Sequence, residues 1–146
     1  MSESAFEVQV RLALHEAYYP YGGFWNNKTG WSSEGLTRNH DPFGGRGAGD
    51  LIGCVLGLWI EVENKARAGK LRELQTTRRD LVTKFGGLYV VCKEVGLTSA
   101  IDFDDGFRQV RLTIDGYIML KVGGEALNEL WTMRAAKVAK VAKVAK

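Results

Sequence analysis

Two spacings of hydrophobic positions divide the first two thirds of the chain into helices and strands. Apolar residues from Phe6 to Ala17 recur every three to four positions, which predicts a helix. Short apolar runs next to glycine predict strands, and the region between residues 27 and 49 lacks either period and is expected to be a long loop. The expected elements are a helix at 5–19, strands at 24–26, 51–56 and 58–65, a helix at 70–85 and a strand at 88–92.

The expected helix at 70–85 is amphipathic. Many of its positions are charged, and its apolar residues fall on the other side. That apolar side consists of Leu74, Leu81, Val82 and Phe85. The order helix, strand, strand, strand, helix, strand predicts an α/β fold with helices flanking a sheet.

The strand at 58–65 carries polar side chains on one face. Glu61, Glu63 and Lys65 alternate with buried-type residues, and side chains two apart in a strand share a face. If this strand and the preceding one form a hairpin that turns at Gly57, the start of one lies beside the end of the other. Asp50 would then face Glu63 and Lys65 across the sheet.

The C-terminal third has weaker patterns. Two apolar runs, 110–114 and 117–120, flank Asp115-Gly116, which favours a β-hairpin, and 125–133 is typical of a short helix. The end of the chain repeats Lys, Val and Ala every three residues, and we expect it to be frayed or disordered when alone. We therefore expect three parts: a core at 1–96, an extension packed on it at 97–133, and a basic tail at 134–146.

Composition fits one domain of ordinary size, with 146 residues, 45% of them hydrophobic. The net charge of +3 is uneven, because the last thirteen residues hold five basic and no acidic residues, leaving 15 basic and 17 acidic residues elsewhere. A generic polyanion binder is therefore not indicated for the body of the chain. The longest apolar run, 51–60, is too short to span a membrane, and the N-terminus does not resemble a secretion signal.

Cysteine and histidine usage excludes a zinc site of ordinary spacing. Cys54 and Cys92 lie in apolar stretches far from both histidines. We expect both cysteines to be buried free thiols in a reducing compartment, which favours a cytoplasmic protein.

The convergence of Asp50, Glu63 and Lys65 suits phosphodiester hydrolysis. Two nearby carboxylates repel each other and favour a hard divalent cation between them, and Mg²⁺ (or Mn²⁺) takes one or two carboxylates plus water and phosphate oxygens. The backbone carbonyl of Asn64 is a further candidate ligand. A lysine beside the metal could orient the attacking water or neutralise developing charge.

By itself, this pattern of two acids and a lysine is weak, because acids and lysines on a strand usually form a solvated face. Two neighbouring features of the sequence are not explained by a solvated face. The segment Gly47-Ala48-Gly49 indicates a backbone that approaches something closely. Gln75 is expected near the start of the following helix, at the same end of the sheet.

The run from Arg46 to Val91 resembles the VRR-NUC branch of the PD-(D/E)XK nucleases, especially its stand-alone phage forms. The likeness covers roughly residues 3–95 and includes FWNNKTG at 24–30 and the first helix. It implies a restriction-endonuclease-like α/β core with α-β-β-β-α-β order and a mixed central sheet flanked by helices. The residues that match the family pattern are Gly47, Asp50, Glu63, Lys65, Gly69 and Gln75.

Two assignments within this resemblance stay open. Glu61 offers a second choice for the catalytic glutamate, but it would put an acid where the lysine belongs, so we favour Glu63. The family's first helix carries an acid near the active site, and Glu3 and Glu7 are equally placed for that role, since residues four apart share a helix face.

The resemblance implies a nuclease that acts on DNA structure and little on base sequence, most similar to homodimeric enzymes that resolve four-way (Holliday) junctions in a phage-infected bacterium. The alternatives are a flap-, fork- or nick-directed or general nuclease of the same fold, and a non-catalytic DNA-binding module. A two-fold dimer would match the two-fold symmetry of a junction. The candidate DNA contacts are Arg46, Lys70, Arg72, Asn27, Lys28, Lys137 and Lys140.

Overall fold

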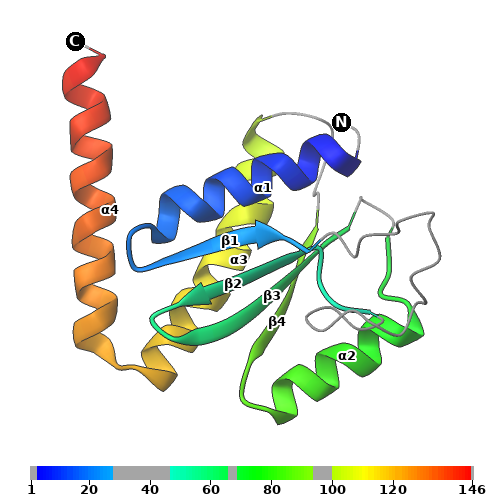
Figure 1. The fold of residues 1–146 in the computed structure, drawn as a ribbon. Helices are drawn as coiled ribbons and strands as arrows, with labels where there is room; N and C mark the ends of the chain where they lie inside the picture. The colour runs from blue at the N-terminus through cyan, green and yellow to red at the C-terminus, as the bar shows by residue number, and fades with distance from the viewer. Residues whose placement is uncertain (1–2, 28–46, 66–68, 94–99, 146) are drawn as a thin grey trace, which may run out of the picture.

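The computed structural model describes residues 3–27, 47–65, 69–93 and 100–145. Figure 1 shows a sheet with helices on both sides. The described elements are α1 (Glu3–Tyr18), β1 (Gly22–Asn26), β2 (Leu51–Val55), β3 (Leu58–Lys65), α2 (Glu73–Lys84), β4 (Leu88–Lys93), α3 (Ala100–Lys121) and α4 (Gly124–Val144). The predicted α/β class and the order of the first six elements are confirmed.

The four strands form one mixed sheet in the order β1-β2-β3-β4. β1 pairs with β2, and β2 with β3, in antiparallel fashion, whereas β3 and β4 are parallel. The predicted hairpin between β2 and β3 is confirmed. Its two-residue turn is formed by Leu56 and Gly57, both with positive φ (51° and 79°), the backbone that such a tight hairpin requires.

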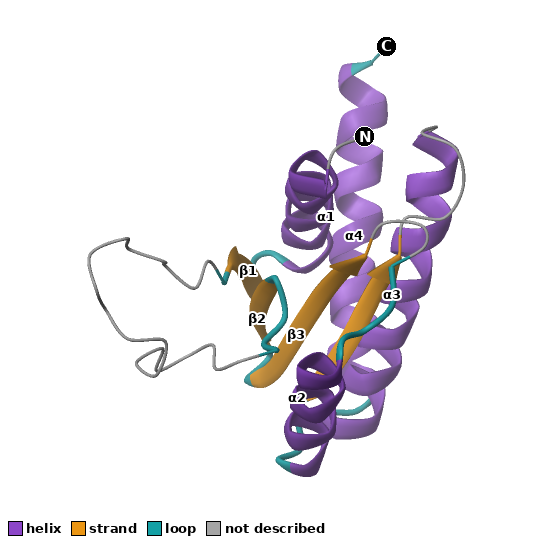
Figure 2. Ribbon diagram, turned by 90° about the vertical axis from the view of Figure 1, so that its right-hand side faces the viewer, coloured by secondary structure: helices purple, strands orange, loops and turns teal. Residues whose placement is uncertain are grey.

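Helices cover the two faces of the sheet differently (Figure 2). α1 and α3 lie on one face, where their apolar side chains share a single buried core with β2, β3 and β4. α2 lies on the other face, against β3 and β4. The face toward α1 and α3 therefore supplies most of the hydrophobic stabilisation, and the face toward α2 is left for polar side chains.

The apolar side expected for α2 does not face the sheet as a whole. Val82 is buried, but Leu74, Leu81 and Phe85 are exposed. The helix instead turns a mixed face inward, on which Gln75 and Arg78 meet the acids of β3. The helical period was predicted correctly, and the polar partners on the sheet set the rotation of the helix.

The predicted hairpin at 110–120 is wrong, because this segment belongs to the continuous helix α3. Asp115 does not form a turn. Its buried carboxylate accepts hydrogen bonds from Tyr18 Oη (2.8 Å), Trp131 Nε1 (3.1 Å) and both terminal nitrogens of Arg134 (2.6 and 2.9 Å). These partners are distant in sequence and satisfy the Asp115 carboxylate inside a helix. They therefore outweigh the local preference of Asp115-Gly116 for a turn.

The expectation of a frayed tail is also wrong for the described residues, since α4 continues to Val144. Its N-terminal half packs through Leu127 and Leu130, and Arg134 pairs with Asp115. Lys137 donates to the carbonyl oxygens of Glu16 and Tyr19, both at 2.7 Å, at the end of α1. Beyond this point the helix extends past the rest of the molecule (Figure 1).

Both cysteines are free thiols, but only one of them is buried as expected. Cys92 lies in the core, where burial raises the pKa of its thiol to about 12, whereas Cys54 is exposed. Among the described residues, no helix combines the length and the apolar character needed to cross a bilayer.

Candidate active site

Asp50 and Glu63 meet at the edge of the sheet where β2 begins and β3 ends. The register pairs Leu51 with Val62, so one step further Asp50 lies opposite Glu63. Asp50 Oδ2 accepts a hydrogen bond from the backbone N–H of Asn64 at 2.8 Å. The pairing that the hairpin predicted is therefore present, and the two carboxylates are close enough for the charge of Asp50 to raise the pKa of Glu63.

Glu63 is buried and only partly satisfied. Its Oε1 contacts Lys65 Nζ at 2.7 Å and accepts a hydrogen bond from the Gln75 side-chain amide, whereas its Oε2 is buried and has no hydrogen-bond partner in the described structure. Burial raises the pKa of Glu63, and Asp50 adds to the rise, while Lys65 and Gln75 oppose it. A buried carboxylate oxygen without a partner is costly, and a cation would relieve that cost.

Gln75 is oriented by the start of α2. Its Oε1 accepts the backbone N–H of Arg72 at 2.9 Å, as the third residue of a helix does in a capping box. This bond occupies the amide oxygen, so the amide nitrogen is the end that faces Glu63. The capping interaction at the start of α2 therefore also fixes the Gln75 amide as a hydrogen-bond donor to Glu63.

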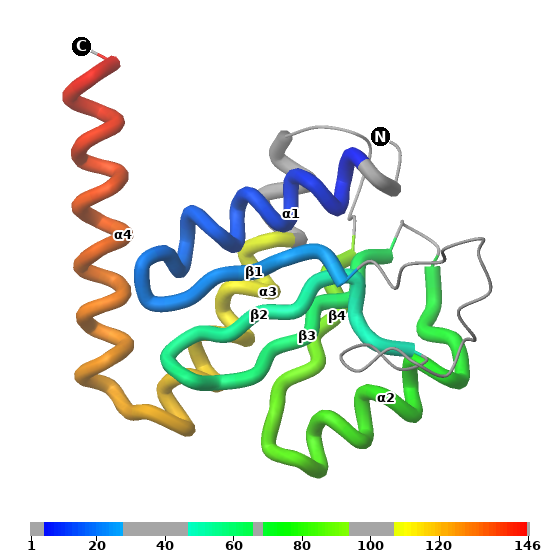
Figure 3. The backbone as a smooth tube through the Cα atoms, viewed as in Figure 1, coloured from blue at the N-terminus to red at the C-terminus, as the bar shows by residue number. Residues whose placement is uncertain are grey.

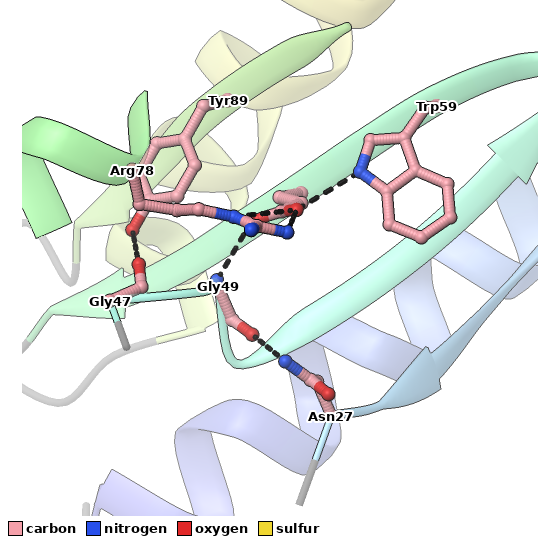
Figure 4. Close-up of polar contacts among 7 residues, drawn as sticks. Asn27, Gly47, Gly49, Trp59, Arg78 and Tyr89 are labelled. Atoms are coloured by element: carbon pink, nitrogen blue, oxygen red, sulfur yellow. Dashed lines mark hydrogen bonds and ion pairs between the residues drawn. The ribbon is translucent and has the colours of Figure 1, made fainter. Parts of the chain in front are cut away.

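Asp50 is the last residue of the segment 47–50, which crosses from α2 to β2 (Figure 3). Asn27 fixes this segment twice, because its backbone N–H donates to Asp50 O at 2.8 Å and its side chain donates to Gly49 O at 3.1 Å. Tyr89 Oη donates to Gly47 O at 3.2 Å (Figure 4). Asn27, directly after β1, and Tyr89 of β4 thus both fix the segment that carries Asp50.

The two glycines of this segment are required by close contacts. Gly47 has φ +81°, and a Cβ there would come within 2.1 Å of Leu74 O in the first turn of α2. A Cβ on Gly49 would come within 2.9 Å of Val62 O. The expectation that the backbone approaches something closely is confirmed, and the neighbours are α2 and β3.

Glu61 lies two residues before Glu63 on the same face and is fully satisfied. Its carboxylate receives Arg78 Nη2 at 2.6 Å, Trp59 Nε1 at 3.0 Å and the Gly49 N–H at 3.2 Å. Figure 4 shows these three donors converging. Glu61 therefore anchors segment 47–50 and α2, which supports the preference for Glu63 as the reactive acid.

Tyr89 and Arg78 belong to the site but were not among the predicted residues. Burial raises the pKa of Tyr89, the charges of Glu63, Glu61 and Asp50 raise it further, and an interaction of its hydroxyl with the Glu63 side chain adds to the rise, although Glu63 Oε2 has no hydrogen bond of normal geometry. Tyr89 is the one polar side chain between apolar neighbours in β4, which was a signal in the sequence. Arg78 had a weaker signal, its spacing of three from Gln75 on α2.

The remaining predicted residues are spread over the molecule. Glu7 is half-buried near the start of α1, which lies over the same edge of the sheet (Figure 1), whereas the side chain of Glu3 lies outside the described residues. Lys70 and Arg72 are exposed just before α2, and the backbone N–H of Arg72 donates to Gln75 Oε1. Arg46 and Lys28 lie outside the described residues, Lys137 is bound to α1, and Lys140 is exposed on α4.

The ligand set fits a hard divalent cation held by few protein groups. Within residues 3–27, 47–65, 69–93 and 100–145, no cluster of three or more His, Cys, Asp or Glu side chains is placed to hold a metal ion. Asp50 and the unpartnered Oε2 of Glu63 supply two carboxylates. The carbonyl of Asn64 points to the same side as its N–H, which contacts Asp50. Such a set leaves positions for water and phosphate oxygens, as Mg²⁺ prefers.

Comparison with known proteins adds no relative. No protein-family model, curated protein or solved structure matches this chain. The function is therefore argued from the geometry of the site.

Proposed function

We propose that this chain is a metal-dependent DNA endonuclease with a PD-(D/E)XK-type active site. The observation that carries the proposal is the buried Glu63 carboxylate, with one oxygen unpartnered, placed beside Asp50 and in contact with Lys65 and Gln75. A purely structural acid would be expected to have its second oxygen satisfied, as that of Glu61 is.

Asp50, Glu63 and the carbonyl of Asn64 would hold Mg²⁺ or Mn²⁺. When bound, the metal supplies Lewis acidity toward a phosphate oxygen and a water molecule. The Lys65 side chain is 13% exposed, and its ammonium contacts Glu63 Oε1 at 2.7 Å. It can orient the attacking water and offset the charge that develops on the phosphate. The water oxygen bonds to phosphorus, the bond to one ester oxygen breaks, and that oxygen takes up a proton.

The contacts of five positions matched to the VRR-NUC pattern, Gly47, Asp50, Glu63, Lys65 and Gln75, are compatible with this proposal. Gly47 packs on α2, and Asp50 and Glu63 face each other. Gln75, in the first turn of α2, donates a hydrogen bond to Glu63. On this basis the substrate we propose is branched DNA, in particular the four-way junction, recognised through its phosphates and shape. Lys70 and Arg72 are exposed and directly precede the helix that carries Gln75, so they are the phosphate contacts that we favour.

The test is cleavage of a panel of end-labelled DNAs with Mg²⁺, Mn²⁺ or EDTA. The panel contains linear duplex, flap, fork and four-way substrates of the same arm sequences. We expect metal-dependent nicks and a preference for the four-way substrate. The variant Asp50→Asn should be inactive, and the matched control Asp80→Asn, which changes an exposed aspartate of α2, should cut normally.

Calorimetry with Mn²⁺ gives a second readout without substrate. Wild type and Asp80→Asn should bind the ion, and Asp50→Asn should not. Absence of both cleavage and metal binding in folded wild-type protein would overturn the proposal. Cleavage with a preference for flaps or forks would keep the nuclease and change its substrate.

A further inference from the structure

A small pocket lies between β3 and α2, at the other end of α2 from Gln75. Its volume is about 240 Å³, and its lining consists of Trp59, Arg78, Leu81, Val82, Phe85 and Gly87. Three of these side chains are large, apolar and still exposed, Trp59 by 37%, Leu81 by 41% and Phe85 by 77%. Exposed apolar side chains that gather in one hollow, instead of being scattered over the surface, indicate a binding site.

The indole ring of Trp59 is fixed in this pocket. Its Nε1 donates a hydrogen bond to Glu61 Oε1 at 3.0 Å, as Figure 4 shows. The ring also packs closely on Gly87, since a Cβ at that glycine would lie 3.3 Å from Trp59 Cδ1. A ring that is already held in place loses little freedom when a second flat group stacks on it, so Trp59 is a preorganised stacking surface.

The charge and the size of the pocket restrict its ligand. Arg78 is the one charged residue among the described residues that line it, and its guanidinium is fixed by Glu61 at 2.6 Å. A guanidinium is planar, stacks on rings and donates hydrogen bonds. The volume is below the range of about 300–1,000 Å³ that drug-sized ligands occupy, so the pocket suits a single ring system. A nucleobase has the flat faces and the polar edge that these residues would recognise.

The pocket lies on the same face of β3 as the candidate active site. Trp59 and Glu63 are four residues apart, and side chains at even spacings in a strand share a face. At about 3.3 Å per residue, the two positions are about 13 Å apart along the strand. The ion pair of Glu61 and Arg78 lies between them. A DNA strand at the candidate site would therefore have its neighbouring nucleotides within reach of the pocket.

We propose that this pocket binds one unpaired nucleobase of the DNA that the enzyme cuts. The inference rests on the proposed nuclease function and adds the feature of the substrate that is recognised. Bases in regular duplex are paired and stacked, and a base that is already unpaired is the easiest to take into a pocket. The pocket thus favours branched DNA that has an unpaired nucleotide near the cut.

Binding of two fork DNAs tests the proposal. Both have the same duplex and single-stranded arms of the same length, but the arms carry thymine bases in one fork and abasic nucleotides in the other. Their phosphates are equal in number, so only the bases differ. Fluorescence anisotropy in EDTA measures binding without cleavage. Wild type should bind the thymine fork about tenfold more tightly, an effect within the range of stacking one base on an aromatic side chain.

Substitutions at the pocket locate this preference. Phe85→Ala removes an exposed ring and should abolish the preference while leaving the affinity for the abasic fork unchanged. Trp59→Ala, with circular dichroism to establish that it is folded, should have the same effect. Phe85→Trp keeps a ring and should keep the preference. The matched control Leu120→Ala removes an exposed apolar side chain of α3 and should bind both forks like wild type.

Equal affinity of wild type for the two forks would overturn the proposal, and so would a Phe85→Ala variant that keeps the preference or loses affinity for both forks equally. Absence of DNA binding would also overturn it and would leave the pocket to a side chain of a protein partner. The outcomes separate this proposal from the nuclease function. A preference for bases without cleavage in Mg²⁺ would keep the pocket and remove the nuclease, whereas cleavage without the preference would do the reverse.

Discussion

Glu61 and Glu63 stand two residues apart on one face of β3 and are both almost fully buried, 0% and 2% exposed, yet their surroundings differ. Every partner of Glu61 is a donor that holds the fold together: Arg78, Trp59 and Gly49. Glu63 faces another acid and keeps one oxygen without a partner in the part of the chain that the structure describes. Burial alone therefore does not distinguish the two acids, and under the proposed function the incompletely satisfied one, Glu63, is the reactive acid.

The largest effect on this contrast is expected from removing the positively charged side chain of Lys65, which contacts Glu63. Lys65→Ala should lower the single-turnover rate of DNA cleavage by about 1,000-fold, because a preorganised charge next to the phosphate is lost. The control Lys84→Ala removes an exposed lysine of α2 and should cut at the wild-type rate. A Lys65→Ala enzyme as fast as wild type would remove lysine from the mechanism.

The second way breaks the Glu61 cluster. Arg78→Ala leaves the Glu61 carboxylate buried without its ion pair, and we expect the free energy of unfolding to fall by about 3 kcal/mol. The adjacent Arg79 pairs with Asp80 on the surface at 3.4 Å, so Arg79→Ala should change it by less than about 0.5 kcal/mol. Urea titration of both variants measures the difference, and equal losses would show that Glu61 is not the structural acid.

The variant Gln75→Ala tests the surroundings of Glu63 through a smaller expected effect, on metal affinity. It removes one donor to Glu63 but leaves Asp50 and Lys65 in place, so Mn²⁺ affinity should fall about tenfold, the effect typical of a group that orients a ligand. Thr77→Ala, on the exposed side of α2, is the control. Isothermal calorimetry on metal-free protein gives both constants. A loss as large as that of Asp50→Asn would make Gln75 a direct ligand.

The smallest expected effect is on the pH dependence of stability without metal. The pKa of Glu63 is raised above that of an unfolded glutamate, so folding favours its protonated form. Its contribution is fully favourable below the unfolded pKa and is lost as the pH rises through the folded pKa. The free energy of unfolding of the metal-free Glu63→Gln variant should therefore fall less than that of wild type as the pH rises across that interval. Parallel curves for the two proteins would show that Glu63 ionises normally.

The sequence was sufficient where local rules decide the structure. The tight turn at Gly57, the period-two pattern of β3 and the glycines of segment 47–50 together placed Asp50 opposite Glu63. It was insufficient where distant partners decide. Asp115-Gly116 satisfies the local rule for a turn, but Arg134 and Tyr18 stabilise Asp115 inside a helix. The role of Arg78 likewise depends on how α2 is rotated on the sheet, which the apolar pattern of α2 did not show.

The anchors of Asn27 have a consequence for how such a site can diversify. Its two hydrogen bonds, to Gly49 and Asp50, join the end of the described segment 3–27 to the start of the described segment 47–65, on either side of residues 28–46. The entropic cost of closing that connection rises by only about 0.6 kcal/mol for each doubling of its length. Insertions and deletions between these two ends should therefore leave Asp50 in place, and under the proposed function they would change substrate preference without changing the metal site.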